Sequence, residues 1–320
     1  MTSTTTSTTH QPSTSPAAWL PLAAVGVTLV FWASAFVAIR HLGHDFSPGA
    51  LSLGRLLVGA VCLGVVAVGF QRGRGLPRPT GRQWVSIVTI GVLWFGVYNV
   101  ALNAGERRVD AGTAAMLIQI SPVLIAVLAS IFLNERFTAY LAGGLALAFA
   151  GVGLISLSTT QSSAQGSNHD VLGVALCLLS ALVYSVSLIL QKPLVARLPA
   201  IHVTWLACTV GAVVCLPFLG QLIDQAQDAP VSSTLWLVYL GVFPTAIAFT
   251  TYAYALRHMT ASNLGVTTYL VPPITIVMGL VFLDEAPPSM AYVGGALALV
   301  GVAVARGKPR TVAEEPCPPA

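Results

Sequence analysis

The chain has 320 residues, of which 55% are hydrophobic and 8% are charged, and its mean hydropathy is +0.81. Soluble domains carry roughly 25% charged residues, so this composition excludes an ordinary water-soluble domain and indicates an integral membrane protein. The net charge of +4 is small and the 15 Lys and Arg are spread between apolar runs, which disfavours a nucleic-acid partner.

Residues 1–18 are mostly Thr, Ser and Pro, without Lys or Arg, so we expect a disordered cytoplasmic tail and not a cleavable signal peptide. A second cytoplasmic tail is expected at 307–320. The five cysteines form no CxxC pair and have no His at ligand spacing. Neither a metal nor a cofactor is therefore expected.

Uncharged apolar runs recur along the rest of the chain, each near the length of about 20 residues that a helix needs to cross a bilayer. We expect an all-α integral membrane protein of ten transmembrane helices, with loops too short for a soluble domain of typical size. The expected spans are 20–39, 47–70, 83–105, 111–133, 137–158, 171–190, 199–222, 231–256, 259–283 and 288–305.

Basic residues predict the orientation of these spans. With both termini inside, the cytoplasmic loops and tails carry 11 Lys and Arg, whereas the outer loops carry 3. Cytoplasmic loops of membrane proteins are enriched in Lys and Arg. Both termini are therefore expected on the cytoplasmic side.

The two halves of the chain are similar in sequence. A shift of 150 residues superimposes Pro, Glu and Gly residues that are uncommon in spanning helices, and a shift of 152 places the first span on the sixth. The pairs are Pro122 with Pro272, Glu135 with Glu285, Gly144 with Gly294, Gly151 with Gly301, Trp32 with Tyr184, and Arg40 with Lys192.

This similarity predicts two five-helix repeats, 19–158 and 171–306, joined by a polar linker at 159–170. An odd number of spans in each repeat makes the two repeats insert in opposite orientations. Inverted repeats recur in transporters because two similar halves can rock about a site between them. The alternative is a gene duplication without transport.

Three short patterns carry a family resemblance. They are Phe-Trp-Ala-Ser-Ala-Phe at 31–36, Arg-Leu-Leu-Val-Gly-Ala at 55–60, and the span ends Leu-Asn-Glu-Arg at 133–136 and Leu-Asp-Glu at 283–285. With these patterns in this order, the chain resembles the EamA family of the drug/metabolite transporter superfamily over residues 20–305. The resemblance implies a ten-helix transporter with a central cavity, in many members exporting amino acids or other metabolites across the bacterial inner membrane. Asn134 and Asp284 stand where the family often has Gly.

Arg55 lies about 12 Å inside the outer end of its expected span, at a rise of about 1.5 Å per residue. A charge at that depth is costly, so Arg55 should face a cavity or a polar partner. It could hold a substrate carboxylate or phosphate through its planar guanidinium. The alternative is a structural Arg satisfied by carbonyl oxygens or reaching outward.

The interiors of the expected spans contain no Asp or Glu. Proton- and cation-coupled transporters commonly use an intramembrane carboxylate. The sequence therefore disfavours carboxylate-driven proton antiport and favours facilitated movement or exchange.

Uncharged polar and aromatic residues at mid-membrane depth are the other candidates for substrate contacts. Helix packing and interhelical hydrogen bonds are the alternative for each of them. These candidates are Trp32, Trp94, Tyr98, Asn99, Gln119, Tyr184, Tyr252 and Tyr269.

Pro122, Pro272 and Pro273 fall near the middle of two expected spans, where they predict kinks or hinges, or are simply tolerated. Glu135 is expected in the first turn of the following helix, with Asn134 as its N-cap. The small-residue faces Gly144 with Ala148 and Gly294 with Ala298 indicate close helix packing or a homodimer contact.

The most consistent function is a transporter whose partners are a small-molecule substrate and membrane lipid. Amino acids or similar amphiphilic metabolites fit Arg55 and the aromatic residues, and hydrophobic drugs are the alternative. A membrane-embedded enzyme is disfavoured because the chain has no HExxH, no GxSxG and no pair of intramembrane carboxylates. A scaffold is a further alternative.

Overall fold

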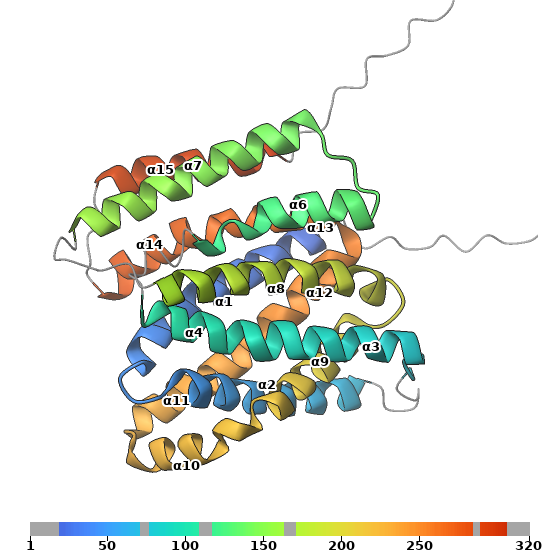
Figure 1. Ribbon diagram of the computed structural model, residues 1–320, viewed down its shortest axis with the longest axis vertical. Helices are drawn as coiled ribbons and strands as arrows, with labels where there is room; N and C mark the ends of the chain where they lie inside the picture. Colours follow the sequence, from blue (N-terminus) through green and yellow to red (C-terminus); the bar gives the residue numbers. More distant parts are fainter. Residues whose placement is uncertain (1–18, 71–76, 109–116, 163–170, 284–288, 306–320) are drawn as a thin grey trace, which may run out of the picture.

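The computed structural model describes residues 19–70, 77–108, 117–162, 171–283 and 289–305. Every regular element in these ranges is a helix. The expected tails at 1–18 and 307–320, and most of the expected linker, lie outside the described residues. Figure 1 shows the helices packed into one bundle.

The helices of the first half begin at Leu20 and end near Ser162. Their bounds are α1 Leu20–Leu42, α2 Pro48–Phe70, α3 Gly81–Ile90, η1 Gly91–Tyr98, α4 Asn99–Glu106, α6 Ser121–Phe132 and α7 Ala139–Ser162. The π-helix η1 continues the axis from α3 to α4, so these three elements form the single span expected at 83–105.

The helices of the second half repeat this order. Their bounds are α8 Val171–Val195, α9 Ala200–Val214, η2 Leu216–Phe218, α10 Leu219–Asp228, α11 Val231–Leu240, η3 Gly241–Ile247, α12 Ala248–His258, α13 Ala261–Thr267, η4 Thr268–Leu270, α14 Val271–Leu283 and α15 Ser289–Ala305. The starts of α3, η1, α6 and α7 each recur 150 residues later, in α11, η3, α14 and α15.

Four helical segments are long and apolar enough to cross a membrane: Pro48–Gly69, Gly81–Glu106, Val171–Val195 and Val231–His258. A fifth follows if the pair Ala200–Val214 and Leu216–Asp228, bent by 53°, is one span. Shorter apolar helices cover the remaining expected spans in part. The described residues therefore establish a helical protein with four or five membrane-capable helices, short of the ten expected.

Two expected helices are interrupted where proline occurs. The span expected at 111–133 has a turn at Gln119 and Ile120, after which α6 begins with Pro122 in its first turn. The span expected at 259–283 is divided into α13, η4 and α14, and Pro272 and Pro273 lie in the first turn of α14. Proline fits the first turn of a helix, where its missing N–H costs no hydrogen bond. The prolines thus lie in the first turns of α6 and α14, directly after the irregular turns at 119–120 and 268–270.

The two halves pack into each other at two equivalent crossings. Gly241 of η3 lies against α2, where an added Cβ would be 2.9 Å from the carbonyl oxygen of Arg55. Gly91 of η1 lies against α9, where an added Cβ would be 2.7 Å from the carbonyl oxygen of Ala207. Each half therefore supplies a helix that closes on the π-helix of the other.

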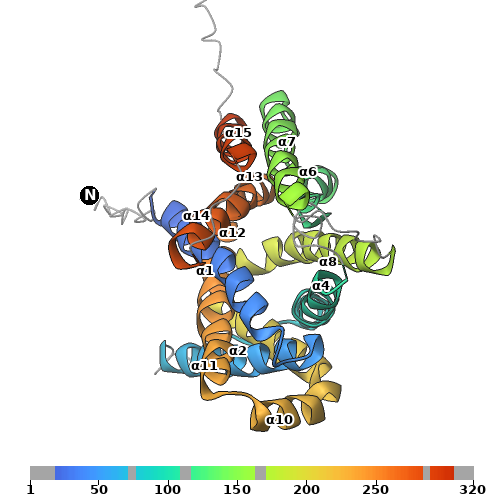
Figure 2. The ribbon, with the colours of Figure 1, turned by 90° about the vertical axis from the view of Figure 1, so that its left-hand side faces the viewer.

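Helices α7 and α15 pair at one end of the bundle, far from α10 and α11 at the other (Figure 2). An added Cβ on Gly151 would be 2.5 Å from the backbone nitrogen of Ala298, and Gly301 approaches Ala148 in the same way. Two helices can approach this closely only through small residues. The small-residue faces thus serve packing within the chain.

Candidate functional site

Aromatic side chains from four segments of the bundle meet near its centre. Trp32 comes from α1, Trp94 and Tyr98 from η1, Tyr184 from α8, and Tyr252 from α12. All five were expected to lie at mid-depth. Two residues that the sequence analysis did not select, Phe95 and Phe249, complete what we call the aromatic cluster.

Trp94 lies at the middle of the aromatic cluster. Its ring centroid is 5.0 Å from that of Phe249 and 5.1 Å from that of Tyr184. Trp94 is 1% exposed and Tyr252 is 0% exposed, whereas Trp32 and Tyr98 at the edges are partly exposed. The cluster therefore has a closed interior and an accessible margin.

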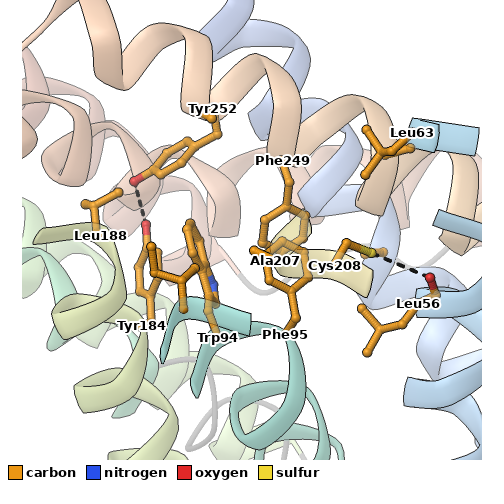
Figure 3. Packing of buried hydrophobic residues seen from close by; sticks show 14 of the residues in the cluster. Leu56, Leu63, Trp94, Phe95, Tyr184, Leu188, Ala207, Cys208, Phe249 and Tyr252 are labelled. Atoms are coloured by element: carbon orange, nitrogen blue, oxygen red, sulfur yellow. Dashed lines mark hydrogen bonds between the residues drawn. The ribbon is translucent and has the colours of Figure 1, made fainter. Parts of the chain in front are cut away.

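One hydrogen bond crosses the aromatic cluster. The hydroxyls of Tyr184 and Tyr252 lie 2.6 Å apart, as the dashed line in Figure 3 shows. Trp32 lies beside both, with ring centroids 6.3 Å from Tyr184 and 4.8 Å from Tyr252. A buried phenol needs a partner, and this pair satisfies both phenols with each other.

The π-helix η1 sets the direction of three aromatic side chains. A π-turn contains one more residue than an α-turn, so side chains are advanced around the axis, and such turns are frequent at functional sites. Asn99 stabilises this turn by donating from Nδ2 to the carbonyl oxygens of Phe95, at 2.9 Å, and Trp94, at 3.2 Å. Asn99 is therefore committed to the backbone, which corresponds to the structural alternative for that residue.

Arg55 lies on α2, at the crossing of α2 with η3. Its side chain is 6% exposed, and Nε donates to Thr245 Oγ1 at 3.0 Å. Thr245 is fixed in turn, because its hydroxyl donates at 2.8 Å to the carbonyl oxygen of Leu240, the last residue of α11. The structure thus joins Arg55 to the π-helix of the opposite half.

Glu106, the last residue of α4, lies within electrostatic range of Arg55 and Tyr98. The sequence analysis overlooked it because the expected span ended one residue earlier. Its spacing from Asn99 and Asn103, seven and three residues, places all three on one helix face, and this signal could have found it. The carboxylate of Glu106, at the end of α4, therefore interacts electrostatically with Arg55 on α2.

Gln119 and Tyr269 lie apart from the aromatic cluster. Gln119 donates from Nε2 to the carbonyl oxygen of Thr268 at 3.2 Å. Tyr269 is fully buried in a separate apolar cluster that includes Leu145 and Val302, and its hydroxyl has no partner among the described residues. The structure brings these two candidates to the helix breaks before α6 and α14.

The loop before α7 corrects the capping expected there. Helix α7 begins at Ala139, and Thr138 caps it by accepting from the Leu141 N–H at 3.2 Å. Asn134 has a φ of 53°, a left-handed conformation that Gly or Asn adopts most readily. Asn134 is therefore suited to the backbone conformation of this loop.

Glu135 caps a helix of the other half instead of its own. Its carboxylate accepts from the Ala261 N–H at 2.7 Å, the Ser262 N–H at 3.0 Å and the Ser262 hydroxyl at 2.7 Å, at the start of α13. Nearby, Lys192 donates from Nζ to the carbonyl oxygens of Leu256, in the last turn of α12, and of Met259, which follows that helix. Each charge faces the complementary end of a helix dipole, which stabilises the link between α12 and α13. Glu285, the shifted equivalent, lies outside the described residues.

Within the described residues, no three His, Cys, Asp or Glu side chains come together to hold a metal ion. Long apolar helices surround buried aromatic groups, an Arg and a hydrogen-bonded tyrosine pair. Buried polar groups of this kind are typical of membrane proteins that bind a small molecule between their helices.

Comparison with known proteins identifies the family. The model of the EamA-like transporter family matches the chain twice, over residues 12–157 and 171–307. The chain therefore belongs to the EamA-like transporter family, and the two matches correspond to the two halves of the helical repeat. As a member of this family it is a multi-pass membrane protein.

Several curated proteins are similar over most of their length. A probable terminal-alkyne amino-acid exporter of Streptantibioticus cattleyicolor is 38% identical over 279 residues, covering 87% of this chain and 91% of the relative. The uncharacterized transporter YdfC of Bacillus subtilis is 30% identical, covering 85% and 86%. An uncharacterized transporter of Archaeoglobus fulgidus is 27% identical, covering 89% and 96%.

A solved crystal structure has the same fold, with a TM-score of 0.73 and 21% sequence identity. The similarity covers 89% of this chain and 96% of that chain. The fold of most of the chain is thus one already known from a crystal structure.

Proposed function

We propose that this protein moves small amphiphilic metabolites, with amino acids as the leading class, out of the cell by alternating access. In this proposal the chain crosses the bacterial inner membrane ten times, as two oppositely inserted five-helix repeats with both termini in the cytoplasm. Transport is either facilitated movement down a gradient or exchange of one compound for another.

The recurrence of the π-helix carries the proposal. Helices η1 and η3 begin 150 residues apart, and each is packed against a helix of the other half through a glycine, Gly91 or Gly241. Two halves that interlock equivalently can exchange roles as the protein opens to one side or the other. The aromatic cluster lies at this interlocked centre, where an alternating site would be.

The substrate class rests on the aromatic cluster and on Arg55. Aromatic rings offer large apolar faces, and the tyrosine hydroxyls offer hydrogen bonds, which together suit a compound with a short apolar part and a polar end. The name of the 38% identical relative, an amino-acid exporter, is consistent with this class and with export. Hydrophobic drug efflux is the alternative, favoured if the polar residues prove dispensable.

The residues proposed to contact substrate differ in how directly the geometry supports them. In this proposal the partly exposed Trp32 and Tyr98 line the accessible side of the aromatic cluster, and the buried Trp94, Tyr184 and Tyr252 support them from within. Arg55 lies beside the aromatic cluster, with Tyr98 within its electrostatic range. Gln119, Tyr269 and the prolines that follow the helix breaks act on the shape of the pathway, and Asn99 acts on η1.

Efflux from proteoliposomes tests this function. Liposomes containing the purified protein and loaded with radiolabelled L-leucine or L-phenylalanine should release label faster than protein-free liposomes. Trp32→Ala should reduce the rate at least about tenfold, because the cluster loses its largest accessible ring. Trp84→Ala removes an exposed Trp at the start of α3 and is the matched control, which should keep the wild-type rate.

Equal release from liposomes with and without protein, for these amino acids and for a panel of hydrophobic dyes, would contradict transport. Release of the dyes alone would favour the drug-efflux alternative.

A further inference from the structure

Helix α10 follows a span that is nearly long enough to cross the membrane without it. Helix α9 has 15 residues and rises about 22 Å, and η2 brings the chain closer to the hydrocarbon thickness of about 30 Å. The chain bends by 53° after α9, and α10 then runs from Leu219 to Asp228. Figures 1 and 2 both show α10 next to α2, at the end of the bundle opposite α7 and α15. Helix α10 therefore lies where the chain leaves the hydrocarbon region.

One face of α10 is docked on the first half of the chain. Leu222 is buried against α2, where an added Cβ on Gly54 would be 3.2 Å from Leu222 Cδ1. Gln225 Oε1 accepts from the Ser47 N–H at 2.8 Å, and Gln221 Oε1 accepts from the Ser47 hydroxyl at 2.8 Å. These contacts fix the rotation of α10 about its own axis, and so determine which of its side chains point away from the protein.

A second face is apolar and exposed, and we call it the apolar stripe. Leu216, Leu219 and Ile223 are spaced by three and four residues, which places them on one side of the chain, and each is between 40% and 48% exposed. Val213 and Val214, at the end of α9, are exposed as well. The apolar stripe thus continues the exposed apolar surface of α9, which faces lipid in a multi-pass membrane protein.

The third face of α10 is polar. Asp224, Gln227 and Asp228 are exposed and recur at the spacing of one helix side. Carboxylates are costly in hydrocarbon, and large apolar side chains are costly in water. A helix with both faces satisfies both conditions at the boundary between lipid and water. Because α10 contains neither Lys nor Arg, the apolar stripe and the docked face would hold it there, and not attraction to anionic headgroups.

We propose that α10 is an interfacial helix whose partner is the lipid–water boundary of one membrane leaflet. The apolar stripe contacts acyl chains, the polar face contacts headgroups and water, and the docked face holds the connection between α1 and α2. In the proposed orientation of the chain this is the outer leaflet. The span expected at 199–222 then ends at the start of α10. The assignment depends on membrane embedding and not on which compound is transported.

Spin labels on the two outward faces of α10 test this assignment. In a background without the five native cysteines, nitroxides are attached to Leu219→Cys, Ile223→Cys, Asp224→Cys and Gln227→Cys, in vesicles of phosphatidylethanolamine and phosphatidylglycerol. Oxygen concentrates in hydrocarbon and a nickel chelate stays in water, so the collision rate with each reagent reports the surroundings of the label. The ratio of oxygen to nickel collisions should be several times higher at positions 219 and 223 than at positions 224 and 227.

Two further positions provide references. Val61→Cys carries the label on an exposed part of α2 and is the lipid reference. Arg78→Cys carries it at an exposed position before α3 and is the water reference. The labels at 219 and 223 should resemble the first, and those at 224 and 227 the second.

A matched pair of substitutions separates the two faces. Ile223→Asp and Gln227→Asp each add one carboxylate to α10 at an exposed position, but only the first places it in the apolar stripe. Ile223→Asp should lower the oxygen-to-nickel ratio of the label at Leu219→Cys severalfold, toward the water reference. Gln227→Asp should leave that ratio unchanged.

Four results would overturn the assignment. A low ratio at all four positions would place α10 in water, and a high ratio at all four would make it part of one bent span within the hydrocarbon. Few collisions with either reagent at positions 219 and 223 would show that protein, such as a second copy of the chain, covers the apolar stripe. Equal effects of Ile223→Asp and Gln227→Asp would show that the two faces do not differ. None of these measurements requires transport, so the proposed function is tested separately.

Discussion

The two π-helices of this protein occupy equivalent places in the two halves yet present different side chains. Both begin with a glycine that packs against a helix of the other half, at Gly91 and at Gly241. Helix η1 presents Trp94 and Phe95 to the aromatic cluster. Helix η3 presents Thr245 to Arg55. The scaffold is thus repeated while the site is not, which allows one pathway to have an apolar side and a charged side.

The largest expected difference between the two π-helices concerns Trp94 and its shifted equivalent, Pro244. Trp94→Ala removes a large side chain that is 1% exposed and should cost about 4 kcal/mol of stability. Pro244→Ala removes little volume and should cost about 1 kcal/mol or less. Thermal unfolding of the detergent-purified variants measures both. Equal losses of stability in Trp94→Ala and Pro244→Ala would contradict the claim that η1, and not η3, has the central packing role.

The second comparison is between Gly91 and Gly241, for which we expect equal losses of stability. A side chain at Gly91 or Gly241 would press on backbone atoms of the other half, so Gly91→Val and Gly241→Val should each cost about 3 kcal/mol through overpacking. The control is Gly26→Val, because an added Cβ at Gly26 has no atom within 4 Å. Abundance and melting temperature in detergent measure the effect. A loss at only one of the two glycines would show that the crossings are not equivalent.

The smallest expected effect concerns the side chains that stabilise each turn from within. Asn99→Ala removes the two hydrogen bonds that Asn99 makes to η1. Thr245→Val removes the hydrogen bond that Thr245 donates to Leu240 at the end of α11, together with the one that it accepts from Arg55. Each should cost about 1 kcal/mol. Thr245→Val should in addition change substrate preference, whereas Asn99→Ala should reduce the rate for all substrates alike. A change of substrate preference with Asn99→Ala would contradict the distinction between the apolar side at η1 and the charged side at η3.

The sequence predicted most of the aromatic cluster for a physical reason. Trp32, Trp94, Tyr184 and Tyr252 all lie within apolar helices, and residues at similar depth converge when such helices form a bundle. Phe95 and Phe249 were missed because a Phe in an apolar run looks the same whether it faces lipid or protein.

Other features required coordinates. The π-turns are not visible in composition, since Gly91–Tyr98 is as apolar as an ordinary helix. Glu135 was expected to act on its own helix, and its true partner, Ser262, lies in the other half and is not predictable from local spacing. Tyr269 shifts onto Gln119 by 150 residues, but the helix breaks next to both place them away from the aromatic cluster.

Opposite insertion of the two halves is the central claim, and cysteine accessibility tests it most directly. Arg78 and Asp228 are exposed, lie 150 residues apart, and precede α3 and α11 respectively. In a background without the five native cysteines, Arg78→Cys and Asp228→Cys are treated in intact cells with a thiol reagent that does not cross the membrane. The account predicts labelling at position 228 and labelling at position 78 only after the cells are opened. The same accessibility at both positions would contradict it.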